Sequence, residues 1–497
     1  MPYDLPQPDH LAETDPPPAQ QPALSLMNQA PGGRIAAPSG ARRAALILAV
    51  LAVAQFLSAL DVFIVNVALT PIGKGLHESS LSNLSWILNG YAIVYAALLV
   101  PAGRLADRFG RKEGFLLGLG LFTAASLGAA VSANLWVLVG FRLLQAAGAA
   151  AMTPSSLGLV LSSAPEGKTA AWVKIWSTSG ALAAAGGPVI GGLLIQASWR
   201  WIFLVNLPVG LIALAVGMRV LPRVRHDISS RVPDLLGGAI LVVAVAALSL
   251  GLVKAPDWGW GSPRTVLTLL VAAAGSVVFV LRTARANTPV IDLRLFHNRA
   301  FSAANVAALA FFAAFSMNLL ALVLWIQGQF GHSPLKTGLL LAPGPALVVV
   351  GVLLGEAVAK RIPVGIVIAT GAVLVAAAFT VFGLATSSAH FDYPVQILPA
   401  WLVGGVGVGL ALPTIISSAT QDLPAHQAAT GSAVVNMASQ IGSVVGVSVL
   451  VVLLATTGHP DPHHNFATAW FTAGALMLIA GLASLAIKHT PTADPAT

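Results

Sequence analysis

The sequence predicts an all-α integral membrane protein with fourteen transmembrane helices, and three observations support this fold class. First, 56% of the 497 residues are hydrophobic and only 9% are charged, whereas an ordinary soluble domain is about 25% charged. Second, apolar windows of about 20 residues, the length that crosses a bilayer, recur fourteen times along the chain. Third, Lys and Arg are divided unequally between alternate loops. The long continuous apolar runs do not fit the alternating pattern of barrel strands, so we expect helices.

The predicted spans follow one another from residue 46 to residue 488. Their limits are 46–70, 86–105, 114–133, 135–160, 172–197, 201–221, 235–253, 265–282, 301–328, 335–358, 363–384, 395–420, 430–456 and 466–488. Residues 1–43 are rich in Pro, Gln and Ala and lack the apolar core of a signal peptide, so we expect a disordered cytoplasmic tail there. Residues 489–497 form a short C-terminal tail.

The orientation follows from the positive charges in the loops. With the N-terminus inside, 20 of the 26 Lys and Arg residues fall on the cytoplasmic side. The five that fall outside are Lys74, Arg200, Lys254, Arg264 and Lys336. This division agrees with the positive-inside rule. It predicts an even number of spans, with both termini cytoplasmic. We expect the protein to lie in a cell membrane, that of a bacterium.

The spacing of the loops predicts two six-helix halves, at 44–221 and 301–488. The longest internal cytoplasmic connections flank an extra helix pair, so that residues 222–300 form a central insertion. The halves show a weak internal sequence similarity at the end of their second spans, between Pro101-Ala-Gly-Arg-Leu-Ala-Asp107 and Gly355-Glu-Ala-Val-Ala-Lys-Arg361. Parallel half-repeats are typical of transporters with a site at the interface between the halves. We expect the extra pair to be dispensable for transport, because a six-plus-six core remains without it.

Two charged residues lie deep in predicted spans. Asp61 interrupts the first span, where an ionised carboxylate is unfavourable by about 2.5–3.5 kcal/mol unless it faces a cavity, takes up a proton or meets a cation. Arg142 lies in the fourth span and also needs a partner. At 1.5 Å per residue, Asp61 lies roughly 22 Å from the inner face and Arg142 roughly 10 Å from the outer face of a core about 30 Å thick. The two depths nearly coincide, so pairing is possible.

Two further motifs are rich in glycine. Gly103-Arg-Leu-Ala-Asp-Arg-Phe-Gly-Arg-Lys112 fills a short inner loop, in which the glycines permit tight turns and Asp107 can pair with a neighbouring arginine or face a helix N-terminus. Gly180-Ala-Leu-Ala-Ala-Ala-Gly-Gly-Pro-Val-Ile-Gly-Gly192 lies in the fifth span. There Pro188 removes one helix hydrogen bond, and Gly187 and Gly191 permit close helix packing.

These motifs resemble those of the major facilitator superfamily. The Gly103–Lys112 loop closely resembles the family's G-x-L-A-D-R-x-G-R-K sequence, and the Gly180–Gly192 segment resembles an element of its antiporter branches. Leu60-Asp-Val-Phe-Ile-Val-Asn-Val-Ala-Leu69 resembles the signature of the fourteen-helix drug:proton antiporters, with Phe63 in place of Thr. The string that begins at Arg142 resembles R-x-x-Q-G-x-G, with Ala146 in place of the first Gly.

Two later stretches resemble the same branch. Trp199-Arg-Trp-Ile-Phe-Leu-Val-Asn-Leu-Pro-Val-Gly210 matches the entry to the sixth helix. Gly431-Ser-Ala-Val-Val-Asn-Met-Ala-Ser-Gln-Ile-Gly442 resembles the thirteenth helix, although Ser439 stands where many members carry Arg. The resemblance therefore extends from about Arg42 to Lys488.

The resemblance implies a proton-coupled antiporter that exports lipophilic drugs by alternating access. It implies proton coupling by Asp61 and Arg142. It implies conformational roles for Gly103, Asp107, Arg108, Gly110, Arg111, Gly187, Pro188 and Gly191. From composition, we expect Asn89, Tyr91, Asn305, Asn318, Gln327 and Asn436 to line the substrate cavity. The expected partners are protons, lipophilic or monocationic small molecules and lipid. We expect a monomer without cofactor, metal or nucleic acid.

Other functions remain open on the sequence alone. A dedicated exporter of one metabolite, such as a self-made antibiotic, would carry the same motifs. The Gly180–Gly192 element disfavours an uptake symporter. A membrane enzyme or receptor would need a catalytic constellation or a soluble domain, and neither is visible. The Gly167-Lys168-Thr169 string lacks the first glycine and the strand of a phosphate loop. The group His459, Asp461, His463 and His464 is interpreted as a solvated loop.

Overall fold

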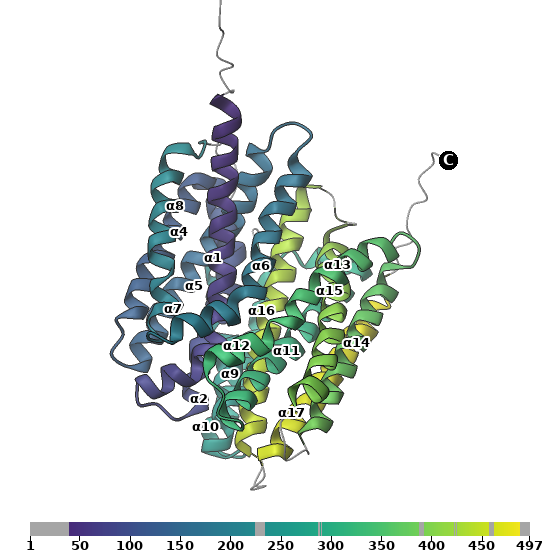
Figure 1. Ribbon diagram of the computed structural model, residues 1–497. Coiled ribbons are helices and arrows are strands. Elements are labelled where there is room, and N and C mark those ends of the chain that lie inside the picture. Colours follow the sequence, from purple (N-terminus) through teal and green to yellow (C-terminus); the bar gives the residue numbers. More distant parts are fainter. Residues whose placement is uncertain are drawn as a thin grey trace, which may run out of the picture. The chain divides into compact units, whose positions relative to one another are not determined.

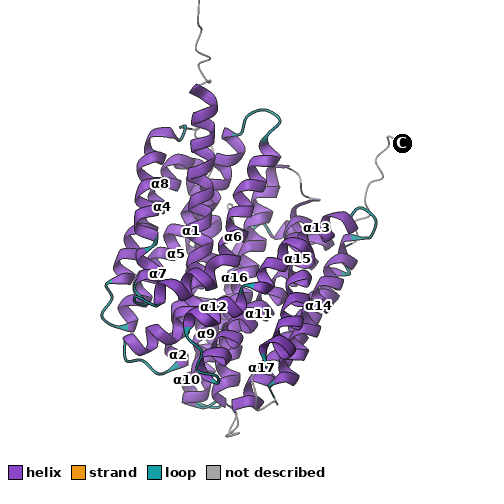
Figure 2. Cartoon of the chain, viewed as in Figure 1, coloured by secondary structure: helices purple, strands orange, loops and turns teal. Residues whose placement is uncertain are grey.

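The computed structural model describes residues 39–223, 234–286, 289, 291–386, 392–421, 423, 425–456 and 462–487, and these form helices and connecting loops (Figures 1 and 2). The chain divides into two units, Met1–Arg42 and Arg43–Thr497. In the first unit only residues 39–42 are described, as the start of a helix. Arg225, Arg231, Lys488, most of the predicted N-terminal tail and residues 489–497 lie outside the described residues. The helical bundle belongs to the second unit.

The regular elements of the described chain run in order from Ser39 to Ser484. They are α1 Ser39–Gly75, α2 Leu81–Leu84, α3 Trp86–Phe109, α4 Arg111–Ala130, α5 Leu135–Ser163, α6 Thr169–Ile195, α7 Trp201–Leu204, α8 Asn206–Val220, α9 Leu235–Trp258, α10 Pro263–Arg285, η1 Leu293–His297, α11 Arg299–Gly328, α12 Pro334–Leu341, α13 Pro343–Val358, α14 Val364–Ala385, η2 Tyr393–Ile397, α15 Leu398–Gln421, α16 Ala425–Thr456 and α17 Pro462–Ser484.

Fourteen helical segments of the described chain are long and apolar enough to cross a membrane. Four of these spans consist of two consecutive elements each, namely α2 with α3, α7 with α8, α12 with α13 and η2 with α15. The predicted number of spans and the all-helical fold are therefore confirmed. α1 begins at Ser39, inside the segment expected to be a tail, because Ala41, Arg42 and Arg43 are strong helix formers that extend it.

Polar residues begin several of these helices at the positions where backbone N–H groups lack partners. The side chains of Asn134, Asp234, Ser262 and Ser333 each accept a hydrogen bond from a backbone N–H group in the first turn, at the starts of α5, α9, α10 and α12. Such caps stabilise a helix by about 1 kcal/mol each. They fix where each span begins and therefore the depth of the side chains within it.

Close helix packing in each half requires glycine. A Cβ atom added at Gly148 of α5 would lie 2.6 Å from the backbone nitrogen of Phe122 in α4, and one added at Gly409 of α15 would lie 2.2 Å from the carbonyl oxygen of Val348 in α13. No larger side chain fits at either position without moving the backbone. In Figure 1, α4, α5 and α8 lie on one side of the helical bundle and α13, α14 and α15 on the other.

Three contacts between the two halves lie near one end of the helices, the end that carries Lys74, Lys254 and Lys336, here called the Lys74 end. Gln327 Nε2 of α11 donates to the carbonyl oxygen of Val67 in α1 at 3.1 Å. A Cβ atom at Gly192 of α6 would lie 2.6 Å from Leu335 Cα of α12. A third contact joins α3 to α16 through Asn89 and Ser448 at 3.3 Å. We call these three contacts the inter-half layer.

The extra pair α9–α10 packs against the rest of the bundle through α9. Gly238 of α9 faces Pro101 of α3, with 3.6 Å between an added Cβ and the proline Cγ. Ser249 of α9 lies 3.1 Å from Ser448 of α16, between their hydroxyl oxygens. α9 therefore contacts both halves, whereas the sequence led us to expect a pair outside the transport core.

Candidate functional site

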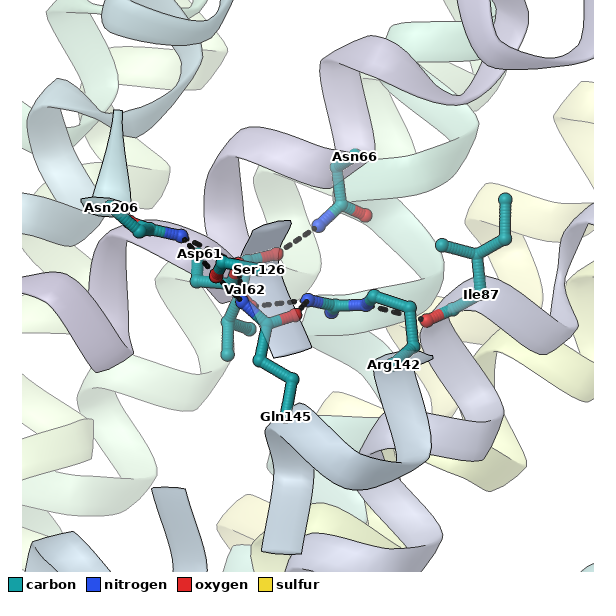
Figure 3. A network of polar contacts seen from close by, with 8 residues as sticks. All are labelled: Asp61, Val62, Asn66, Ile87, Ser126, Arg142, Gln145 and Asn206. Carbon is teal, nitrogen blue, oxygen red and sulfur yellow. Dashed lines mark hydrogen bonds and ion pairs between the residues drawn. The ribbon is translucent and has the colours of Figure 1, made fainter. Parts of the chain in front are cut away.

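The candidate site is a buried ion pair inside the N-terminal half. Asp61 projects from α1 and Arg142 from α5, and they are 0% and 1% exposed. Arg142 Nη1 donates to Asp61 Oδ2 (Figure 3). The structure thus brings together the two charged residues whose depths in the sequence nearly coincide.

Two amide side chains donate to Asp61, and both also donate to the hydroxyl of Ser126 beside it. Gln145 Nε2, from α5, donates to Asp61 Oδ1 at 2.8 Å and to Ser126 Oγ at 2.7 Å. Asn206 Nδ2, at the start of α8, donates to Asp61 Oδ1 at 3.4 Å and to Ser126 Oγ at 3.1 Å. Ser126 belongs to α4, and none of the three is more than 1% exposed. Figure 3 shows them gathered around the carboxylate.

Arg142 also has partners that do not depend on Asp61. Its Nη1 donates to Gln145 Oε1 at 2.7 Å, and its Nε donates to the carbonyl oxygen of Ile87 in α3 at 3.3 Å. Its guanidinium carbon lies 4.3 Å from the ring centre of Tyr91, which is also on α3. A buried guanidinium is stabilised by such hydrogen bonds and by cation–π contact. Arg142 could therefore keep several contacts if the carboxylate lost its charge.

The network is electrically neutral and closed. One carboxylate and one guanidinium cancel each other, and the amides bring no formal charge. Because Asp61 has no exposed surface, a proton cannot reach it from water while the helices keep this arrangement. Its hydrogen-bond partners come from α5 and α8, and Ser126 of α4 bonds to two of them. These helices all belong to the N-terminal half, so the carboxylate lies within that half and not on a wall between the halves.

Gln145, Ser126 and Asn206 were not identified from the sequence as site residues. Gln145 carried one available signal, because it follows Arg142 by three positions and so lies on the same helix face. Ser126 and Asn206 are single polar residues in apolar segments, as many others in this chain are. Only the packing of α4 and α8 against α1 distinguishes them.

The predicted conformational residues of α6 pack against α1 next to Asp61, at Phe63 and Ile64. Added Cβ atoms at Gly187 and Gly191 would lie 2.7 Å from Phe63 Cβ and 2.8 Å from Ile64 Cγ1. These two α1 residues follow Asp61 within one helical turn. The carbonyl oxygen of Pro188 faces α12, 2.2 Å from a Cβ added at Gly338. α6 therefore connects the helix of Asp61 to the C-terminal half.

The other predicted conformational residues lie where α3 ends and α4 begins. The segment expected to be a loop is helical except at Gly110, with Gly103, Asp107 and Arg108 in α3 and Arg111 at the start of α4. Arg111 Nε lies 2.7 Å from Asp107 Oδ1, and Arg111 Nη1 donates to the carbonyl oxygen of Gly158 in α5 at 3.0 Å. Gly110 separates the two helices with φ of 119°, a conformation that disfavours a side chain. Gly103 packs against Pro154 of α5, and the guanidinium of Arg108 lies over Phe109.

The six residues expected to line a substrate cavity lie in different places. Asn89 contacts Ser249 and Ser448, and Tyr91 contacts Arg142. Gln327 joins α11 to α1. Asn318 Oδ1 accepts from Trp470 Nε1 at 3.0 Å inside the C-terminal half, while Asn305 and Asn436 donate to carbonyl oxygens one turn back in their own helices.

A cavity of about 600 Å³ opens at the Lys74 end, between α1 and α2 on one side and α11, α16 and α17 on the other. None of the six predicted residues lines it. His463 and His464 lie in the first turn of α17, while His459 and Asp461 lie outside the described residues. In the part of the chain that the structure describes, no group of three or more His, Asp or Glu side chains is placed to hold a metal.

The bundle of fourteen helical spans in the described chain is the fold of a membrane transporter. The chain matches the family model described as Major Facilitator Superfamily over residues 51–447, and it belongs to that family. It is a multi-pass protein of the bacterial cell membrane.

Similar curated proteins carry names that concern resistance and export. The chain is 35% identical to the tetracenomycin C resistance and export protein of Streptomyces glaucescens, over 82% of this chain and 76% of that protein. It is 35% identical to a methylenomycin A resistance protein of Bacillus subtilis, over 88% and 91% of the two chains. It is 33% identical to the multidrug resistance protein Stp of Mycobacterium tuberculosis, over 82% and 76%.

Similar solved structures include a peptide transporter, POT, in complex with sulfate. The TM-score is 0.65 over 90% of this chain and 98% of that chain, with 18% identity. At this identity the likeness concerns the fold alone.

Proposed function

We propose that this protein is a proton-coupled antiporter that exports lipophilic small molecules from the cytoplasm by alternating access. The names of its relatives, which refer to resistance and export, support this function. The uneven distribution of Lys and Arg supports an orientation in which the Lys74 end faces outward. The observation that carries the proposal is the sealed Asp61–Arg142 pair.

Protonation of Asp61 changes the balance of this site. The neutral network becomes a network of charge +1, because Arg142 keeps its charge while the carboxylate loses its own. Arg142 then retains Gln145, the Ile87 carbonyl and the Tyr91 ring, and the attraction between α1 and α5 weakens. Since Asp61 is sealed, uptake and release of the proton require a second arrangement of the helices. This requirement links the proton to a conformational change.

The free energy that one proton supplies is of the same order as the cost of breaking the Asp61–Arg142 pair. Breaking a buried ion pair by removing one partner costs about 3–5 kcal/mol. A proton that moves down 100 mV supplies about 2.3 kcal/mol, and one pH unit adds about 1.4 kcal/mol. The sum of about 3.7 kcal/mol falls within that range. One proton for each cycle thus supplies a free energy of the same order as the cost of separating the pair.

A dedicated exporter of one metabolite is a second candidate. It is favoured by the names of relatives that concern a single compound, tetracenomycin C or methylenomycin A. Both candidates share the site and the fold. They differ in the number of unrelated compounds to which the protein confers resistance.

The test is a resistance profile over many compounds in a drug-sensitive bacterium that expresses the wild type, Asp61→Asn or Glu356→Gln. We expect raised resistance with the wild type, lost when an uncoupler collapses the proton gradient. Asp61→Asn should lose it at equal membrane abundance, because its amide cannot ionise and exchange a proton in the cycle. Glu356 is an exposed carboxylate on α13, so Glu356→Gln is the matched control and should retain resistance. Wild-type resistance from Asp61→Asn would contradict the proposal.

A further inference from the structure

Three polar side chains from three separate regions of the chain meet in the apolar interior. Asn89 lies on α3 of the N-terminal half, Ser249 on α9 of the extra pair, and Ser448 on α16 of the C-terminal half. Their exposures are 1%, 1% and 0%. Asn89 Nδ2 donates to Ser249 Oγ at 3.2 Å and to Ser448 Oγ at 3.3 Å, and the two hydroxyls lie 3.1 Å apart. Each side chain therefore contacts both of the others.

We infer that Ser249 is a positioning residue of the transport cycle, and that with Asn89 and Ser448 it forms a latch that holds the two halves together at the Lys74 end. The inference deepens the proposed function, because it rests on alternating access. It gives the extra helix pair a specific part in that cycle.

The latch lies in the inter-half layer. Asn89, Ser249 and Ser448 are about seven to nine residues from the ends of their spans at the Lys74 end, Leu81, Trp258 and Ala455. This corresponds to about 10–14 Å along each span. The Gln327–Val67 hydrogen bond and the Gly192–Leu335 contact join the halves in the same region. Separation of the halves at this end requires Ser448 to leave the other two residues.

α9 is attached to the N-terminal half at points other than the latch. Lys254 Nζ donates to Asn83 Oδ1 of α2 at 2.8 Å, and Gly238 faces Pro101 of α3. We therefore expect α9 to stay with α3 when the halves separate. Ser249 then remains beside Asn89 and keeps one hydrogen bond to it, so that the amide still has a partner. The bond between Ser249 and Ser448 exists only in the closed arrangement.

The proton site and the latch share α3. Ile87 and Tyr91, two positions before and after Asn89, contact Arg142. Residues two apart on a helix point in different directions, so one side of α3 meets Arg142 while another meets α9 and α16. A displacement of α3 when Asp61 is protonated would therefore act on the latch directly.

This geometry predicts a graded effect of two substitutions. Ser249→Ala removes one hydrogen bond that is specific to the closed arrangement, because the Asn89–Ser249 bond is lost from both arrangements. Ser448→Ala removes two such bonds. One net hydrogen bond corresponds to about a fivefold shift in an equilibrium, and two to roughly thirtyfold. We expect these shifts in the ratio of open to closed protein.

The experiment uses distances between spin labels. The chain contains no cysteine, so Ser79→Cys and Lys336→Cys place labels at exposed positions of the N-terminal and C-terminal halves at the Lys74 end. The full-length protein in lipid nanodiscs is measured without substrate and without a proton gradient. Failure of drug resistance in cells would count against the proposed function, whereas the label distances test the latch alone.

Three further variants serve as controls. Ser249→Thr keeps the hydroxyl and should retain the wild-type distances. Ser276→Ala removes a hydroxyl from α10 that bonds only within its own helix, to Ala272. Ser316→Ala removes a hydrogen bond to Ser443 within the C-terminal half. Neither alanine control should lengthen the distances between the halves.

The expected result is a larger long-distance fraction in Ser249→Ala, a still larger one in Ser448→Ala, and no change in the three controls. Wild-type distances in Ser249→Ala would overturn the inference. An equal shift in Ser249→Thr would also overturn it, because packing and not the hydroxyl would then be responsible.

Discussion

Arg142 combines several contacts that a single ammonium group cannot reproduce. Its guanidinium donates to Asp61, Gln145 and the Ile87 carbonyl and lies over the Tyr91 ring. We predict that Arg142→Lys lowers the initial efflux rate by about 10–100-fold, since one or two buried hydrogen bonds and the planar stacking are lost. Efflux of a substrate found in the resistance profile gives the rate, normalised to the protein in the membrane. Arg264→Lys, at an exposed position of α10, is the control. Wild-type efflux by Arg142→Lys would remove the guanidinium from the mechanism.

The sequence identified the charged residues of the site but not their uncharged partners. Asp61 and Arg142 could be found because a charge in an apolar span needs a specific explanation. Ser126 and Asn206 could not, because an uncharged polar side chain in a span has many possible partners and only tertiary packing selects one. Asn89 was predicted to line the substrate cavity. Its contacts with α9 and α16 could not be predicted, because Ser249 and Ser448 are 160 and 359 positions away.

An ion pair between Asp234 and Arg282 joins the two helices of the extra pair. Asp234 caps the start of α9, and Arg282 lies in the last turn of α10. Arg282 Nε donates to Asp234 Oδ2 at 2.8 Å, and Arg282 Nη2 donates to Asp234 Oδ1 at 2.7 Å. The hydrogen bonds from Arg282 hold the pKa of the Asp234 carboxyl below its usual value, and the Gly237 N–H group lowers the pKa further. A carboxyl whose folded pKa is lowered stabilises the fold above its unfolded pKa, about 3.9, and loses this contribution as the pH falls through the folded pKa.

We therefore predict that Asp234→Asn lowers the thermal unfolding temperature of the purified protein at pH 7. The difference from the wild type should shrink as the pH falls below the unfolded pKa of about 3.9 and through the lowered folded pKa. Asn still caps α9, so the change removes the charge and leaves the cap. Asp257→Asn, at an exposed carboxylate paired with Lys254, should have little effect. A pH-independent difference for Asp234→Asn would show that charge pairing is not the cause.

The sequence predicted where the membrane spans lie better than where a span is divided into two helices. Runs of about 20 apolar residues determine where spans lie. The division between α12 and α13 at Ala342 carries a local signal, because Pro343 has no backbone N–H group to donate to the preceding turn. The contact of α9 with both halves carries none, because α9 is apolar on most sides and the single hydroxyl of Ser249 does not indicate which neighbours it meets.

For the whole molecule, the location of the carboxylates bears on substrate charge. Asp61 is sealed and paired, and every other carboxylate of the described chain lies near or beyond the end of a span. The sequence alone led us to expect that Asp61 would neutralise one charge on a monocation. Its burial inside the N-terminal half removes that reason, but the expected preference remains, because a charge without a partner at the bilayer centre costs about 2.5–3.5 kcal/mol.

We predict that neutral or monocationic lipophiles are exported at least about tenfold more efficiently than matched dications. Competitive efflux of two dyes that differ by one quaternary ammonium group, compared at equal uptake, measures this ratio. Equal export of the dication would show a second anionic group in the substrate path, and Glu356→Gln would be the first variant to examine.

The central claim is that Asp61 exchanges a proton for substrate, and proton movement in liposomes tests it most directly. Purified wild type or Asp61→Asn is reconstituted with an internal pH-sensitive dye, and a substrate from the resistance profile is then added outside, with the membrane potential held at zero. The account predicts that inward substrate movement through the wild type drives protons out and raises the internal pH, and that Asp61→Asn produces no such change. A substrate-driven pH rise of wild-type size with Asp61→Asn would contradict it.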